Sequence, residues 1–65
     1  MDYFVIKDRD TGLYYRGKGI NKWGGKYYNQ ASIYRIKNMA KSIAKEENLR
    51  GANCEVISIR IIELN

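Results

Sequence analysis

One stretch with helical periodicity, residues 32–49, most constrains the fold of this 65-residue chain. Its apolar side chains recur at spacings of three and four, which is typical of one face of an α-helix. They are Ile33, Ile36, Met39, Ala40, Ile43, Ala44 and Leu49. Because this is the only good helix in the sequence, a helix-turn-helix is excluded.

The two ends of this helix are predicted from local signals. Asn29 and Ser32 are both acceptable N-caps, so the helix is predicted to begin at Ser32. The β-branched residues near the start leave a second interpretation open, in which residues 31–35 are extended and the helix begins near Ile36. Gly51 is placed to end the helix.

Strand patterns lie on both sides of the helix. Residues 3–7 and 54–64 are rich in β-branched and aromatic side chains, which favour strands. A turn with Asp and Gly, residues 8–12, leads into residues 13–16 as a returning strand, so an antiparallel hairpin is predicted. Residues 26–29 could add a short strand at the edge of the sheet.

The whole chain, residues 1–65, is therefore predicted to be one α+β domain with the order ββαβ. One helix packs on one face of a small antiparallel sheet. In the last strand Ile57, Ile59 and Ile61 share a face between flanking acids, so this face is predicted to be core. The full predicted core is Phe4, Ile6 (or Val5), Leu13, Ile36, Ala40, Ile43, Ile57, Ile59 and Ile61.

Charge is distributed unevenly along the chain. The formal net charge is +5, yet no acid occurs between Thr11 and Lys45. This interval holds eight of the twelve Lys and Arg residues and six of the eight aromatic residues. Such an asymmetry creates a local positive potential that attracts polyanions. The alternative interpretation is ordinary solubilising charge.

Residues 14–28, YYRGKGINKWGGKYY, combine glycines, cations and rings. Their spacing matches neither a Walker A loop nor a dinucleotide fingerprint, nor the RRM signature. What remains is a glycine-rich loop whose lysines and backbone N–H groups could meet phosphates. Tyr15, Trp23 and Tyr28 could form a lid on the core. Alternatively, exposed rings could stack on bases or anchor a protein partner. The candidates are Tyr14, Trp23, Tyr27 and Tyr34.

Catalytic and metal sites are not predicted. The chain has no histidine and therefore no imidazole base, and one cysteine with scattered carboxylates is not a zinc site. Cys54 begins an apolar strand and is predicted to be a packed structural thiol. We expect no enzyme activity, no cofactor and no metal. The lone cysteine, and the lack of a signal-peptide pattern or an apolar run of about 20 residues, favour a cytoplasmic protein without a membrane partner.

Several segments together resemble small uncharacterised accessory proteins of phages and prophages of Gram-positive bacteria. They are YYRGKGINKW, Ala31-x-Ile33-Tyr34, Ala40-Lys41-x-x-Ala44 and the β-rich C-terminal part. The resemblance implies an accessory role such as inhibition of host defence, as by anti-CRISPR proteins that bind nucleic-acid-loaded effectors. Many such inhibitors are acidic mimics of nucleic acid. Because this chain is basic, it would contact guide RNA or acidic protein patches instead.

The predicted function is that of a small non-enzymatic, phage-type binding protein. Its basic, aromatic surface would engage nucleic acid or a nucleic-acid-loaded host protein, and the role that the resemblance implies is inhibition of host defence. The predicted binding residues are Tyr14, Arg16, Lys18, Lys22, Trp23, Lys26, Tyr27, Lys37, Lys41 and Lys45. The alternatives are a protein-only interaction module and a free-standing DNA-binding domain similar in architecture to integrase arm-binding domains. A homodimer paired through the last strand is compatible with each.

Overall fold

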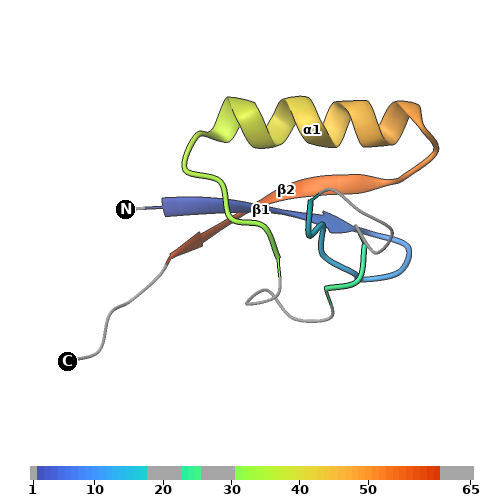
Figure 1. Ribbon diagram of the computed structural model, residues 1–65, viewed down its shortest axis with the longest axis horizontal. Helices are drawn as coiled ribbons and strands as arrows, with labels where there is room; N and C mark the ends of the chain where they lie inside the picture. Colours follow the sequence, from blue (N-terminus) through green and yellow to red (C-terminus); the bar gives the residue numbers. More distant parts are fainter. Residues whose placement is uncertain (1, 18–22, 26–30, 61–65) are drawn as a thin grey trace.

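The computed structural model describes residues 2–17, 23–25 and 31–60. Within them lie strand β1 (Asp2–Asp8), helix α1 (Lys37–Leu49) and strand β2 (Cys54–Arg60). The two strands pair antiparallel, with Val5 opposite Ile57 near the centre of the ladder. Helix α1 runs along β2 on one side of the sheet (Figure 1). This arrangement confirms the predicted α+β class, with one helix packed on a small antiparallel sheet.

β1 is the central strand, because its edge away from β2 is also hydrogen-bonded. Two backbone hydrogen bonds of 2.8 Å connect it to the returning chain: Asp8 N–H to Leu13 C=O, and Tyr15 N–H to Ile6 C=O. Residues 13–15 therefore return beside β1, as the predicted hairpin requires. They meet it through an isolated bridge rather than as a full strand. The pairing stops there because the next outward-facing position of β1, Phe4, is already paired with Tyr34.

The chain just before α1 is extended and completes the same edge of the sheet. The backbone N–H groups of Phe4 and Tyr34 each donate to the other's C=O, at 2.8 and 2.9 Å. The N–H of Ser32 donates to the C=O of Tyr15 at 2.9 Å. These groups are thus used in sheet pairing, so the predicted helix start at Ser32 is wrong. The alternative, with residues 31–35 extended before the helix, is confirmed.

The C-terminal end of α1 follows the prediction. The helix ends at Leu49, and Gly51 has a φ of +107°, a left-handed conformation that glycine adopts without strain. The chain can then turn back, and the N–H of Ala52 donates to the C=O of Glu47 at 3.1 Å. This bond satisfies one of the last carbonyls of the helix, which have no partner within it.

The core lies between the sheet and α1. Its buried members are Ile6, Ala40, Ala44 and Cys54, and the residues that pack against them are Phe4, Tyr15, Trp23, Tyr34, Ile43, Ala52 and Val56. The core predictions are therefore confirmed at Phe4, Ile6, Ala40 and Ile43. The small side chains of Ala40 and Ala44 let the helix approach the sheet closely. Close packing matters in a short chain, which can bury only a small core.

The face of β2 that meets the helix is the opposite of the one predicted. Cys54 and Val56 lie on the helix side, because the antiparallel register places Val56 opposite Ile6. Ile57 and Ile59 are half-buried on the other face, where Ile57 pairs with the fully buried Val5. Both faces of the ladder carry apolar side chains, so the strand pattern alone did not decide which face the helix covers.

Three further core predictions have different outcomes. Ile36 is 60% exposed, so its assignment to the core is wrong. It precedes the first residue of α1 and lies outside the buried stripe of the helix. Leu13 is half-buried and does not belong to the core cluster. The last four residues of the predicted final strand, which include Ile61, lie outside the described residues, as does the predicted short strand at 26–29.

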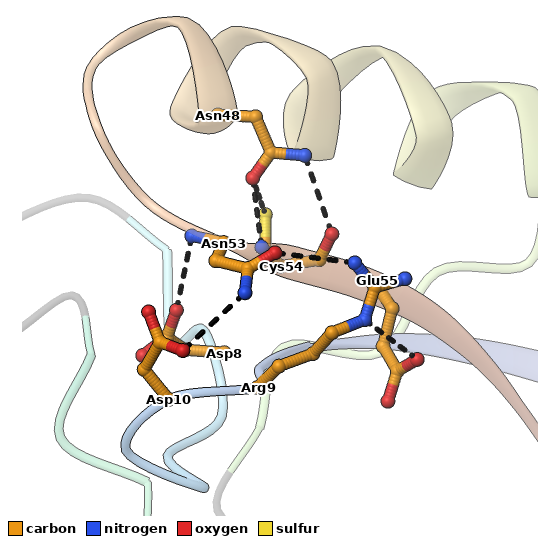
Figure 2. Close-up of polar contacts among 7 residues, drawn as sticks. All are labelled: Asp8, Arg9, Asp10, Asn48, Asn53, Cys54 and Glu55. Atoms are coloured by element: carbon orange, nitrogen blue, oxygen red, sulfur yellow. Dashed lines mark hydrogen bonds and ion pairs between the residues drawn. The ribbon is translucent and has the colours of Figure 1, made fainter.

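A buried carboxylate ties the first turn to the beginning of β2. Asp8 is 9% exposed and accepts three hydrogen bonds. They come from the Thr11 N–H (3.0 Å), the Thr11 hydroxyl (2.7 Å) and the Asn53 N–H (3.1 Å), the last of which is drawn in Figure 2. The hydroxyl bond is the main cause that lowers the pKa of Asp8 below its ordinary value of 3.8, while burial opposes it. The ionised form is therefore the one that stabilises the fold.

We expect Asp8→Asn to reduce stability near neutral pH and to flatten the acid limb of the stability profile. Because the folded-state pKa is lowered, the contribution of Asp8 is complete above the unfolded-state pKa. It is lost as the pH falls through the lower folded-state value. Urea unfolding between about pH 5 and pH 2 measures this loss. Asp10→Asn removes the same charge from the same turn and is the control; equal acid profiles for the wild type and Asp8→Asn would contradict the assignment.

Candidate binding groove between α1 and β2

Three of the predicted binding residues line one groove. Lys37, Lys41 and Lys45, here called the lysine row, are exposed on one flank of α1. The groove between this flank and β2, here called the α1–β2 groove, has a volume of about 650 Å³. Its apolar lining comes from Ala44, Leu49, Cys54 and Val56, and its polar lining from Arg9, the lysine row, Asn48 and Glu55. Three lysines predicted from the sequence to bind therefore border a surface that also offers apolar contact.

The lysine row carries the net charge of the groove. Arg9 is neutralised locally, because its Nε lies 3.2 Å from a carboxylate oxygen of Glu55. Within residues 2–17, 23–25 and 31–60, the ion pairs join other residues: Arg9 with Glu55, Arg50 with Glu46 and Glu47, and Arg60 with Asp2. None of these described pairs uses a lysine of the row. Among the described residues, the three positive charges of the lysine row are therefore not paired with an acid and contribute a local positive potential.

Two aromatic rings from residues 14–28 belong to the core. The rings of Tyr15 and Trp23 are 5.3 Å apart, centroid to centroid, in an edge-to-face arrangement, and both pack against the buried cluster. Edge-to-face packing adds to the apolar area that the two rings bury. For Tyr15 and Trp23 the lid interpretation is thus confirmed. Tyr28 lies outside the described residues.

Tyr14 is held in place by its backbone. It bridges to Lys7 on one side and to Gly25 on the other. A Cβ on Gly25 would lie 3.2 Å from the Cβ and the carbonyl oxygen of Tyr14, so glycine permits this close approach. The Tyr14 ring is half-buried, and the Lys7 ammonium lies 5.5 Å from its centroid. One cation therefore already occupies a face of this ring.

The other predicted binding residues are divided between exposed, half-buried and undescribed positions. Arg16 is exposed and does not line the α1–β2 groove. Tyr34 is half-buried, and burial, with Tyr15 as a second cause, raises the pKa of its phenol. The remaining predicted residues, Lys18, Lys22, Lys26 and Tyr27, lie outside the described residues.

Sequence reasoning missed the residue that connects α1 to the edge of β2. The side chain of Asn48 accepts a hydrogen bond from the N–H of Cys54 at 2.7 Å and donates one to the C=O of the same residue at 3.2 Å. Figure 2 shows both contacts. Asn48 lies three and seven positions beyond Lys45 and Lys41, so it shares their flank of the helix. A polar amide in register with the lysine row is the signal that could have identified it.

Cys54 fits the prediction of a structural thiol. It is buried and unpaired, and its Sγ lies 3.3 Å from the C=O of Ala44 and 3.0 Å from Oδ1 of Asn48. Burial is the main cause that raises the pKa of this thiol, and the carboxylates of Glu47 and Asp8 add to the effect. A thiol that resists ionisation is a poor nucleophile.

The described residues contain neither a metal-binding cluster nor a membrane-spanning helix. They contain no group of three or more His, Cys, Asp or Glu side chains arranged to hold a metal ion. Their helix also lacks the length and apolarity needed to cross a membrane.

Comparison with known proteins gave no relative. No protein family, curated protein or solved structure matches the chain.

Proposed function

We propose that this chain is a small non-enzymatic binding module that holds an acidic segment of a protein partner in the α1–β2 groove. The observation that carries the proposal is the lysine row beside an apolar lining, with no described acid paired to it. Interfaces combine apolar contact with charges that select the partner and speed its encounter. An acidic protein segment with some apolar side chains would satisfy both parts of the groove.

The described rings of Tyr14, Tyr15 and Trp23 favour a protein segment over single-stranded nucleic acid. Binding of unpaired bases needs ring faces that are free to stack. Tyr15 and Trp23 are packed in the core, and the Tyr14 ring already has the Lys7 ammonium nearby. Nucleic acid is the second candidate, because the interval between Thr11 and Lys45 has cations and no acid. Such an interval would attract the phosphates of DNA or RNA.

The biological setting is part of the same proposal. The resemblance to phage and prophage accessory proteins supports a role in modulating a host system, such as its defence machinery. We place the protein in the host cytoplasm, because Cys54 is a free thiol and free thiols persist in a reducing compartment.

Loss of two lysines from the row should weaken the binding of a glutamate-rich peptide. We expect Lys37→Gln/Lys41→Gln to reduce affinity about 2- to 30-fold, because each exposed ion pair contributes about 0.2–1 kcal/mol. Fluorescence anisotropy of a labelled peptide at physiological salt measures the change. The matched control is Arg16→Gln/Arg35→Gln, which removes two exposed charges that do not line the groove.

The same two variants distinguish the candidate functions. If a short oligothymidine binds more tightly than the peptide and depends on Lys37 and Lys41, the nucleic-acid candidate replaces the protein one. The logarithm of the oligothymidine affinity should then fall linearly with the logarithm of the salt concentration. The slope should be about −0.7 for each phosphate contacted. Equal losses in the two double variants would place the binding surface outside the groove.

A further inference from the structure

Among residues 2–17, 23–25 and 31–60, β2 has an outer edge with backbone groups that no other backbone group pairs. In an antiparallel ladder, residues whose N–H and C=O point towards the partner alternate with residues whose groups point away. The even-numbered residues of β1 point away from β2, as shown by the pairing of Phe4 with Tyr34. By the register, Cys54, Val56 and Ser58 of β2 also point away from the ladder. No backbone group in the described part of the chain pairs with Val56 or Ser58 on that side.

Asn48 already occupies the first position of this edge. A side-chain amide has the same donor and acceptor as a peptide group. The amide of Asn48 meets the outward N–H and C=O of Cys54 at 2.7 and 3.2 Å, as a neighbouring strand would. The next outward position, Val56, lines the groove beside the lysine row, and the outward position after it along β2 is Ser58. The edge therefore offers groups for pairing, and the described residues fill only its first position.

The spacing of the lysine row fits an added strand. Residues four apart on a helix are separated by about 6 Å along its axis, since the rise is about 1.5 Å per residue. Alternate side chains of a strand, which share a face, are about 6.6–6.8 Å apart. A strand that runs beside β2 would thus place acidic side chains at alternate positions opposite Lys37, Lys41 and Lys45. A helical partner would leave the open edge of β2 unpaired.

We infer that an extended acidic segment of a partner protein binds by adding a strand to the outer edge of β2, with acidic side chains at every second position facing the lysine row. This inference rests on the proposed function and specifies its binding mode. Main-chain hydrogen bonds to Val56 and Ser58 give affinity, and the alternating acids give register and specificity.

A second copy of the chain is a poorer occupant of the same edge. Antiparallel pairing of β2 with β2 of a second copy, about a two-fold axis, would bring both helices to the same side of the joint sheet. The two lysine rows would then face each other, and like charges in close apposition repel. An acidic partner replaces this repulsion with attraction.

Amide hydrogen exchange with a designed peptide tests the inference on the unmodified chain. The probe is acetyl-Thr-Glu-Val-Glu-Val-Glu-Thr-amide, and its control is an isomer with the three glutamates adjacent. Binding should slow exchange at Val56 and Ser58 by about tenfold when about nine-tenths of the protein is bound, because exchange then proceeds through the free tenth. Ile57 is the internal control, because its N–H already faces β1.

Two N-methylated peptides test the strand geometry without changing the protein. Methyl groups are placed on the amides of the glutamates in one peptide and on those of the valines in the other. In an added strand, either the glutamate amides or the valine amides face β2, but not both. The peptide methylated on the amides that face β2 should lose about tenfold or more in affinity, and the other peptide should bind almost as the unmethylated peptide does. Weaker binding of the isomer with adjacent glutamates would support the predicted spacing.

The other outcomes overturn the inference in distinguishable ways. If all peptides bind equally and depend on Lys37 and Lys41, the proposed function stands and strand addition is wrong. If no peptide binds and an oligothymidine does, the proposed function is also wrong. If the protein sediments as a dimer that Ser58→Pro converts to a monomer, a second copy occupies the edge. Proline at Ser58 removes an outward N–H and leaves the bonds to β1 in place.

Discussion

Ile6→Ala is expected to remove a large part of the protein's stability. Ile6 is fully buried at the centre of the core cluster, and replacement of a buried isoleucine by alanine costs about 2–5 kcal/mol. A chain of 65 residues has a total stability of about 3–10 kcal/mol, at about 0.05–0.15 kcal/mol per residue. Urea unfolding followed by far-ultraviolet circular dichroism and by the fluorescence of Trp23 measures the loss.

Ile36→Ala provides the matched control for this prediction. It deletes the same atoms from an isoleucine that is 60% exposed, so the stability change should stay within about 0.5 kcal/mol. A large loss at Ile36 with a small one at Ile6 would contradict the arrangement of the core and would favour the core predicted from helical periodicity.

Asn48→Ala should destabilise the protein by about 1–3 kcal/mol, a large effect for a residue on the surface. The substitution leaves the N–H and C=O of Cys54 without their partner, and Cys54 is only 4% exposed. Buried backbone groups that lose a hydrogen bond are costly because water replaces the partner poorly. Thermal or urea unfolding gives the size of the effect, and faster amide exchange at Cys54 locates it.

Asn38→Ala is the control on the same helix. Asn38 is exposed in the first turn of α1, so its replacement should be neutral or slightly stabilising, since alanine has the higher helix propensity. Similar stabilities for the two variants would show that the contacts of Asn48 with Cys54 do not hold the helix to the strand.

The arrangement of the fold was largely predictable because its local signals agree. The β-branched run in β1, the turn at Asp8 and the helix end before Gly51 each follow from residue type, and all three are confirmed. The helix start was not decided by local signals. Ser32 is a good N-cap in isolation, but its N–H is used in pairing with Tyr15. Tertiary pairing thus overrode a local preference.

The candidate site was predictable in part, for a similar reason. A spacing of four in sequence is enough to place the lysine row on one flank of a helix. Which element faces that flank depends on the strand register, and alternation in β2 allowed either face to meet the helix. The contact between Asn48 and Cys54 depends on the same register, so no local pattern identified it.

The position of β1 between its neighbours has a consequence for how the protein is made. Its ladder partner is far along the chain, since Val5 pairs with Ile57, 52 positions later. Pairing between such distant segments raises the contact order and slows folding. During translation β1 is synthesised before residues 54–60, and the ladder cannot form until both segments have left the ribosome. The sheet therefore closes only after most of the chain has emerged, and until then β1 remains exposed to chaperones and to other nascent chains.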